Sequence, residues 1–287
     1  MNLREDGWGA PVPGRVSVVM LTLDRFQFIG PAIESVRIQE YDEWELIVVQ
    51  DGDNQWIKMA MADYQLRDAR IRYFCRPTLG SIGSAINFAL ATATGEYMAI
   101  LDDDDRWTDP RKLSMQVQAM AGNRRLACIG GGAVVVDCAG VEKLRYFKPL
   151  ADQDCRRRPL LANPIIHSTA MFRMAALKTV SGYDESIQEY QDWDLVLRLM
   201  RTGTVENLPK VLAEYRVWNG SSSTSKGIRN AKCAVAIVWR HRKDFPGSTF
   251  AMMVAWAYLC ISLLPHAVRR PLFECLSRLK KRFFSSA

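Results

Sequence analysis

The sequence lacks the short motifs that mark several classes of nucleotide-binding enzyme. It has no Gly-x-Gly-x-x-Gly between a strand and a helix, which argues against a dinucleotide-dependent oxidoreductase. It has no Walker-type phosphate loop either. Residues 22–30 contain a single glycine, Gly30, where a nucleotidylyltransferase would carry a glycine-rich loop after its first strand. The one glycine cluster, residues 130–132, leads into the strand-like AVVVD, so these three classes are disfavoured.

Cysteine pairs and a secretory leader are missing as well. The 287 residues contain seven cysteines, an odd number, and no two are spaced as Cys-x-x-Cys. This pattern disfavours a zinc site or a disulfide framework and favours reduced thiols in a reducing compartment. The opening residues, MNLREDGWGAPVPG, have no apolar run behind their charges, so we expect no secretory signal. We therefore expect a cytoplasmic protein.

Positive charge is concentrated in one segment. The formal net charge is +7, and residues 269–282 hold six basic residues against one acid, Glu274. The rest of the chain is nearly balanced, which disfavours nucleic acid as a partner. Because 48% of the residues are hydrophobic, a folded protein with a sizeable core is expected.

Strand-like and helix-like segments alternate over the first hundred residues. Buried strands are predicted at 16–23, 45–50, 71–75 and 97–101, with a helix from Pro31 and another at 83–94. This alternation predicts βαβ units and an open, mainly parallel α/β sheet with flanking helices. Further on we expect a helix from Asp109, strands in LACIGGGAVVVD and STAMFR, a helix over 192–202 and a strand over 211–218. Beyond Ser225 the pattern is helical only.

Acidic and turn-forming residues follow three of these predicted strands. The first strand ends in Thr22, Asp24 and Arg25, the second in Asp51-Gly52-Asp53, and the fourth in the four aspartates 102–105. Taken singly, the first two groups read as ordinary turn chemistry. Four adjacent carboxylates repel one another. Directly after a buried strand this repulsion costs free energy unless a cation relieves it. Because Mg²⁺ and Mn²⁺ prefer oxygen ligands, a divalent metal is the expected cofactor.

The order of these motifs resembles that of the family 2 glycosyltransferases, which have a GT-A fold. The family's motifs correspond here to Thr22-Leu23-Asp24-Arg25, Gln50-Asp51-Gly52-Asp53, Gly83 to Asn87, GEYMAILDDDDRW, GYDES at 182–186 and QDWDLVLRL at 191–199. The resemblance covers about residues 15–218 in consistent order. Six motifs in register make it specific.

The resemblance implies a role for each matching residue. The donor nucleotide would be contacted by Thr22, Asp24, Arg25, Asp51, Gly83, Asn87, Asp102 and Asp103, with Asp102 at the ribose. Asp104 or Asp105 would hold the metal, and Asp192 would be the general base. Without the resemblance, Asp192 would read as a helix N-cap or a dipole-favoured acid. His167 could line the acceptor site, although a lone histidine is more often structural.

The implied activity is an inverting transfer of a sugar from a UDP-, GDP- or dTDP-sugar to a hydroxyl of a lipid-linked or polysaccharide acceptor. Asp192 would take the proton of that hydroxyl. The sequence departs from the family at Gln50 and Gln191, where acids are usual. This departure keeps open a catalytically inactive relative that binds nucleotide or a partner protein, although Asp104 and Asp192 are retained.

The C-terminal segment has its own pattern. Residues 250–264 form an uncharged apolar run of 15, short of the about 20 that span a membrane, so a buried or an interfacial helix is expected. Residues 269–287 interleave basic and apolar residues, which favours an amphipathic helix on an anionic membrane over a solvated basic face or a partner-binding helix. The prediction is therefore an extension at 1–14, a catalytic domain at 15–225 and a membrane-associating segment at 226–287, located on the inner face of the cytoplasmic membrane.

Overall fold

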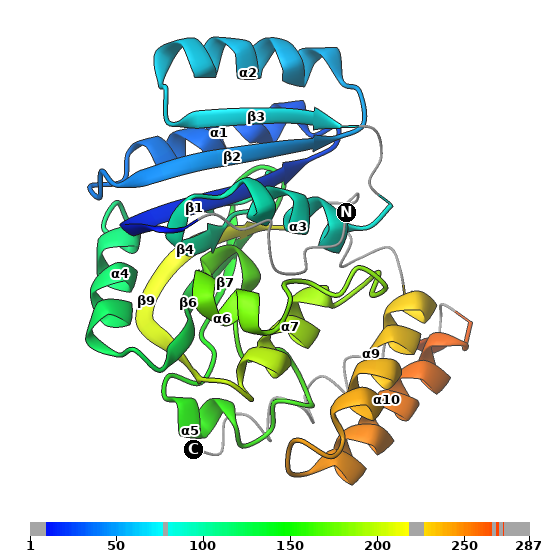
Figure 1. Ribbon diagram of the computed structural model, residues 1–287. Helices are drawn as coiled ribbons and strands as arrows, with labels where there is room; N and C mark the ends of the chain where they lie inside the picture. The colour runs from blue at the N-terminus through cyan, green and yellow to red at the C-terminus, as the bar shows by residue number, and fades with distance from the viewer. Residues whose placement is uncertain (1–9, 77–79, 218–226, 266–267, 270–271, 273–287) are drawn as a thin grey trace.

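A mixed nine-stranded sheet forms the centre of the molecule in the computed structural model, which describes residues 10–76, 80–217, 227–265, 268–269 and 272 (Figure 1). The strand order is β3-β2-β1-β4-β8-β6-β9-β5, and β7 pairs with β6. The strands are β1 (Val12–Thr22), β2 (Trp44–Asp51), β3 (Ile71–Arg76), β4 (Gly95–Ile100), β5 (Arg106–Trp107), β6 (Leu126–Val136), β7 (Glu142–Tyr146), β8 (Met171–Arg173) and β9 (Thr204–Arg216).

The N-terminal half of the sheet confirms the predicted βαβ units. The strands β1 to β4 are parallel, and the connecting helices are α1 (Phe26–Arg37), α2 (Gln55–Arg67) and α3 (Ile82–Thr92). Residues 16–20 of β1 are buried on both faces, which is why this strand reads as a continuous apolar run.

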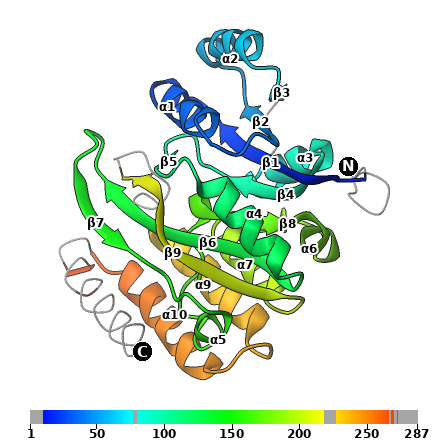
Figure 2. The ribbon, with the colours of Figure 1, turned by 90° about the vertical axis from the view of Figure 1, so that its left-hand side faces the viewer.

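The C-terminal half of the sheet is mostly antiparallel. The strand β8 runs antiparallel to both β4 and β6, and β5 runs antiparallel to β9, whereas β6 and β9 are parallel. Strands β6 and β7 form a hairpin whose tip extends beyond the neighbouring strands (Figure 2). The remaining elements of this half are α4 (Lys112–Gly122), α5 (Asp152–Cys155), the short 3₁₀ helix η1 (His167–Thr169), α6 (Met174–Thr179) and α7 (Gln191–Leu199).

Three predicted boundaries were wrong. The helix α1 begins at Phe26, so Pro31 lies inside it and not at its start. The strand β1 begins at Val12, within the predicted extension, because the Val12 amide donates to the Thr94 carbonyl at 2.8 Å. The strand β9 begins at Thr204 rather than at 211 because its Pro209 falls at an irregularity in the pairing with β6, where proline is tolerated.

Two hydrophobic layers cover the sheet. One contains Val18 and Val48 from the strands with Ile33 of α1 and Met61 of α2. The other contains Val19 and Ile47 with side chains of α3, α6 and α7. Because successive strand residues point to opposite faces, the apolar runs of β1 and β2 supply both layers.

The helices α9 (Gly227–His241) and α10 (Ser248–Ser262) pack side by side next to the part of the molecule that holds the sheet (Figure 1). Ile237, Ala251 and Val254 join the same hydrophobic cluster as Val19. The outer face of α10 and the residues after it expose large apolar side chains: Met253, Trp256, Leu263 and Leu264. No described helix has the length and apolar character needed to cross a membrane. The predicted amphipathic helix over 269–287 lies almost entirely outside the described residues.

Candidate active site

The candidate site lies at the point where the order of the parallel strands reverses. From β1 the chain continues to β2 on one side and returns to β4 on the other side. In open α/β sheets, ligands bind outside the carboxyl ends of the strands at such a switch point. A cavity of about 340 Å³ opens there, and Arg25 after β1 and Asp102 after β4 both line it. We call it the carboxylate cavity.

The four aspartates that follow β4 form a turn in which the side chains alternate. The Asp105 amide donates to the Asp102 carbonyl at 3.1 Å and closes the turn. Asp102 and Asp104 line the carboxylate cavity, whereas the side chains of Asp103 and Asp105 are buried. The structure thus divides the acidic run into two carboxylates that face the cavity and two that support the turn.

The two buried carboxylates are held by specific partners. The Arg25 guanidinium lies 2.7 Å from Asp103 and 3.3 Å from Asp104. Ser168 Oγ donates to Asp105, and the Arg216 amide donates to Asp105 at 2.9 Å. Burial raises the pKa of Asp103 to about 7 against the opposing charge of Arg25. Burial and the neighbouring acids raise the pKa of Asp105 well above its usual range. Both buried side chains therefore hold a proton more readily than an exposed aspartate does.

Asp192 is positioned by the start of α7. Tyr190, two residues before Asp192, has φ = 63°, a left-handed backbone conformation that is uncommon for a residue with a bulky side chain. Asn163 Nδ2 donates to Asp192 Oδ2 at 2.8 Å. The indole nitrogen of Trp193 donates to the Pro159 carbonyl at 2.8 Å and anchors the same turn. An acidic side chain is favoured at a helix N-terminus, and here it also lines the carboxylate cavity.

His167 belongs to the site, although its sequence context gave only a weak indication. It lines the carboxylate cavity, with Nδ1 3.9 Å from Asp102 and Nε2 2.9 Å from the Tyr183 hydroxyl. Several other lining residues were not singled out from the sequence. They include Tyr146, Lys148, Tyr215 and Arg216, as well as Glu189 and Tyr190 directly before the motif at 191–199.

Two of the predicted donor-binding residues make contacts that hold the fold together. Asn87 is buried, donates to the Tyr183 carbonyl at 2.8 Å and accepts from the Tyr183 amide at 2.9 Å. Gly83 packs so closely that a Cβ would lie 3.3 Å from the Asp184 carbonyl oxygen. The structure therefore uses the Gly83-to-Asn87 motif to dock α3 on residues 182–185, and neither residue is among those lining the carboxylate cavity.

The other predicted positions lie at the expected strand ends. Thr22 is buried at the end of β1, Asp24 is exposed just after it, and Asp51 is half-buried at the end of β2. Of the two departures from the family pattern, Gln50 is buried and accepts a hydrogen bond from the Tyr73 hydroxyl. Gln191 lines the carboxylate cavity.

The described residues contain no group of three or more histidine, cysteine or acidic side chains arranged to hold a metal ion. Within the acidic turn, the carboxylates that line the cavity are those of Asp102 and Asp104. Mg²⁺ is commonly bound by one or two carboxylates together with substrate phosphates, and this donor set fits that mode.

The mixed sheet with its flanking helices has the GT-A fold of solved glycosyltransferase structures. The chain belongs to glycosyl transferase family 2, whose family model matches residues 17–181. It is therefore a transferase enzyme.

Individual proteins show the same relationship. The chain is 37% identical to a protein of Escherichia coli strain K12, provisionally named colanic acid biosynthesis glycosyl transferase WcaA, over 64% of this chain and 66% of that protein. S. aureus TarS 1-349, solved with UDP-GlcNAc, matches 86% of this chain and 72% of its own at a TM-score of 0.64 and 17% identity. The mannosyltransferase PcManGT from Pyrobaculum calidifontis was solved with GDP-Man and Mn²⁺. It matches 94% of this chain and 78% of its own chain, at a TM-score of 0.63 and 18% identity. At these identities the two structures establish the fold.

Proposed function

We propose that this enzyme transfers a sugar, with inversion, from a nucleotide-sugar donor to a hydroxyl group of a glycan or lipid-linked acceptor. The observation that carries the proposal is that Asp102, Asp104 and Asp192 line one cavity at the switch point of the sheet. Two of these acids follow a central strand and the third begins a separate helix. The cavity therefore brings a donor-binding edge and a candidate base together.

The donor lies, in this proposal, along the carboxyl ends of β1, β2 and β4. Asp51 and the residues Thr22 to Arg25 contact the base, and Asp102 contacts the ribose. Asp102 and Asp104 would supply the oxygen ligands for a divalent metal. Asp103 and Asp105, the latter also a predicted ligand, are buried and would support them from within the turn. When bound, that metal would supply a Lewis acid beside the diphosphate.

The acceptor hydroxyl loses its proton to Asp192 as its oxygen bonds to the anomeric carbon. The bond between that carbon and the donor phosphate oxygen breaks at the same time, and the nucleoside diphosphate leaves with the bonding electrons. Attack from the opposite face inverts the anomeric configuration. The hydrogen bond from Asn163 at 2.8 Å orients the carboxylate that takes the proton.

The acceptor and the location of the enzyme form the second part of the proposal. We place the enzyme on the cytoplasmic face of a membrane, acting in the assembly of a surface polysaccharide. The apolar outer face of α10, the basic sequence of residues 269–287 and the naming of WcaA for colanic acid biosynthesis support this assignment. Deleting residues 269–287 should abolish partitioning of the protein to anionic liposomes, and unchanged partitioning would remove the membrane role.

The donor site is tested by calorimetric binding of UDP, GDP and dTDP, each with and without Mn²⁺. We expect Mn²⁺-dependent binding of one nucleotide to the wild type and loss of that binding in Asp104→Ala. The matched control is Asp63→Ala, an exposed acid on α2 paired with Arg67. Absence of nucleotide binding under every condition would remove the donor site and, with it, the proposed function.

A further inference from the structure

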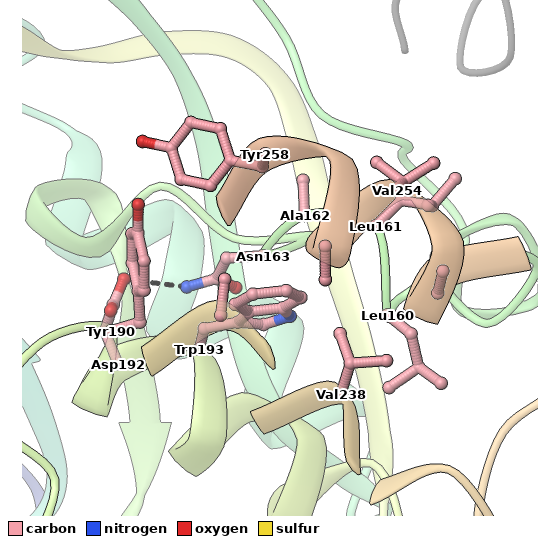
Figure 3. A pocket seen from close by; sticks show the side chains of 13 residues that line it. Leu160, Leu161, Ala162, Asn163, Tyr190, Asp192, Trp193, Val238, Val254 and Tyr258 are labelled. Carbon is pink, nitrogen blue, oxygen red and sulfur yellow. Dashed lines mark hydrogen bonds between the residues drawn. The ribbon is translucent and has the colours of Figure 1, made fainter. Parts of the chain in front are cut away.

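A second cavity of about 550 Å³ adjoins the carboxylate cavity. We call it the apolar cavity. Its walls come from the loop at residues 160–163, the start of α7, and the facing sides of α9 and α10 (Figure 3). Its volume is within the roughly 300–1,000 Å³ of small-molecule sites.

The polar groups of the apolar cavity lie at one side. Figure 3 shows Asp192, Asn163 and Tyr190 together, and Leu160, Val238 and Val254 on the opposite side. The Asn163 amide is already bonded to Asp192, and the Trp193 indole nitrogen is bonded to the Pro159 carbonyl. Because a carbohydrate needs polar partners for its hydroxyl groups, the Leu and Val side suits a hydrocarbon.

Asp192 and Tyr190 belong to the walls of both cavities. A molecule whose hydroxyl group reaches Asp192 can therefore extend into the apolar cavity, while a donor occupies the carboxylate cavity. Tyr190 is the residue with the left-handed backbone at this boundary. Such conformations cluster at functional sites, which agrees with a role in separating the two ligands.

We propose that the acceptor carries an apolar chain next to its reactive hydroxyl and that this chain binds in the apolar cavity beside Asp192. This inference rests on the proposed function because it names the acceptor class of the same site. The helices α9 and α10 then have a role in substrate binding, since Val238, Val254 and Ala255 come from them.

Binding of hexyl, octyl and decyl glucoside, each below its micelle concentration, tests the proposal by calorimetry on the full chain. These neutral probes join sugar hydroxyl groups to an alkyl chain. Affinity should rise roughly fourfold for each methylene group that enters the cavity, until the cavity is filled. Glucose at the same concentrations should show no binding. An affinity independent of chain length would overturn the proposal.

Variants locate the binding site. Ala255→Trp fills the cavity from α10 and Ala234→Leu narrows it from α9, and each should weaken octyl glucoside binding at least tenfold. The control Met253→Trp changes an exposed residue of the same helix and should leave binding unchanged. Equal binding in all three variants would place the probe elsewhere and overturn the assignment.

Nucleotide binding separates this inference from the proposed function. We expect the cavity variants to retain Mn²⁺-dependent nucleotide binding, which also shows that they are folded. A protein that binds nucleotide but shows no dependence on alkyl chain length would refute the apolar acceptor alone. A protein that binds no nucleotide would refute the donor site, whatever the glucosides show.

Discussion

The two cavities that meet at Asp192 are built in different ways. The carboxylate cavity sits on the ends of central strands, where Arg25 contacts Asp104 and Ser168 donates to Asp102. The apolar cavity is enclosed by a loop and by helices from the far end of the chain. The first is a preorganised set of charges on a rigid sheet, whereas the second depends on how the C-terminal helices pack.

Two acids of α7, Asp192 and Asp194, have similarly different surroundings although only one residue separates them. Asp192 is half-buried and faces both cavities. Asp194 is fully buried and accepts hydrogen bonds from Arg198 at 2.7 Å and His241 at 2.8 Å. In the proposed function Asp192 takes the acceptor proton, whereas the contacts of Asp194 join α7 to α9.

Replacing Asp192 tests the catalytic side of this comparison and should have the largest effect. In Asp192→Asn the amide cannot accept the acceptor's proton, so turnover should fall by about 10²- to 10⁴-fold. Release of nucleoside diphosphate measures turnover. Nucleotide affinity should stay within about twofold of the wild-type value because the substitution removes no contact to the nucleotide. The control Asp63→Asn should behave as wild type. Full turnover in Asp192→Asn would show that another group takes the proton.

Replacing Asp194 tests the structural side. Asp194→Asn leaves Arg198 and His241 without their buried carboxylate and should lower the free energy of unfolding by about 3 kcal/mol, measured in urea. Burial acts to raise the pKa of Asp194, but the His241 hydrogen bond and the Arg198 charge outweigh it and lower that pKa.

The pH dependence of the Asp194 contribution follows from that direction. A carboxylate with a lowered native pKa stabilises the fold fully above its unfolded pKa of about 3.9. That contribution is lost as the pH falls through the native pKa. The stability difference between wild type and Asp194→Asn should therefore be constant near pH 6 and shrink below pH 4. A difference that grows on acidification would contradict the assignment.

The acidic turn of the carboxylate cavity could be located from sequence because its four aspartates directly follow a strand-like apolar run. Runs such as YMAIL followed by four aspartates identify both the strand and the turn. Sequence could not tell which of the four face the cavity, because Ser168 and Arg216, which hold Asp105, lie more than 60 residues away. The apolar cavity was not predictable, since Leu160, Trp193 and Val254 meet only after long-range packing.

Asn87 tests whether a family motif can serve packing rather than binding. Asn87→Ala removes the hydrogen bonds to the backbone of Tyr183 and leaves buried groups unpaired, so the free energy of unfolding should fall by about 2 kcal/mol. Nucleotide affinity, measured at a temperature where the variant is folded, should be unchanged. A stable variant with weakened nucleotide binding would return Asn87 to the donor site.

Lys112 contacts Trp107 just after the acidic turn, and replacing it should change how stability depends on pH. It is fully buried, its Nζ donates to Gln116 at 2.7 Å and lies 3.9 Å from the centre of the Trp107 ring. Trp107 in turn donates to the Ser168 carbonyl at 2.9 Å, which connects this lysine to the support of Asp105. Burial lowers the pKa of Lys112 well below its usual range.

A lysine with a lowered native pKa binds fewer protons in the folded chain than in the unfolded one. Stability should therefore rise with pH between the native pKa and the unfolded value of about 10.4, by up to about 1.4 kcal/mol per pH unit. Lys112→Met keeps the side-chain volume but has no titrating group at this position. It should therefore be the more stable protein at neutral pH. Urea unfolding of both proteins between pH 7 and 9 measures the difference, in which the shared tyrosine titrations cancel. If the difference is flat over that range, Lys112 is charged in the folded protein, and the packing behind the carboxylate cavity tolerates a buried cation.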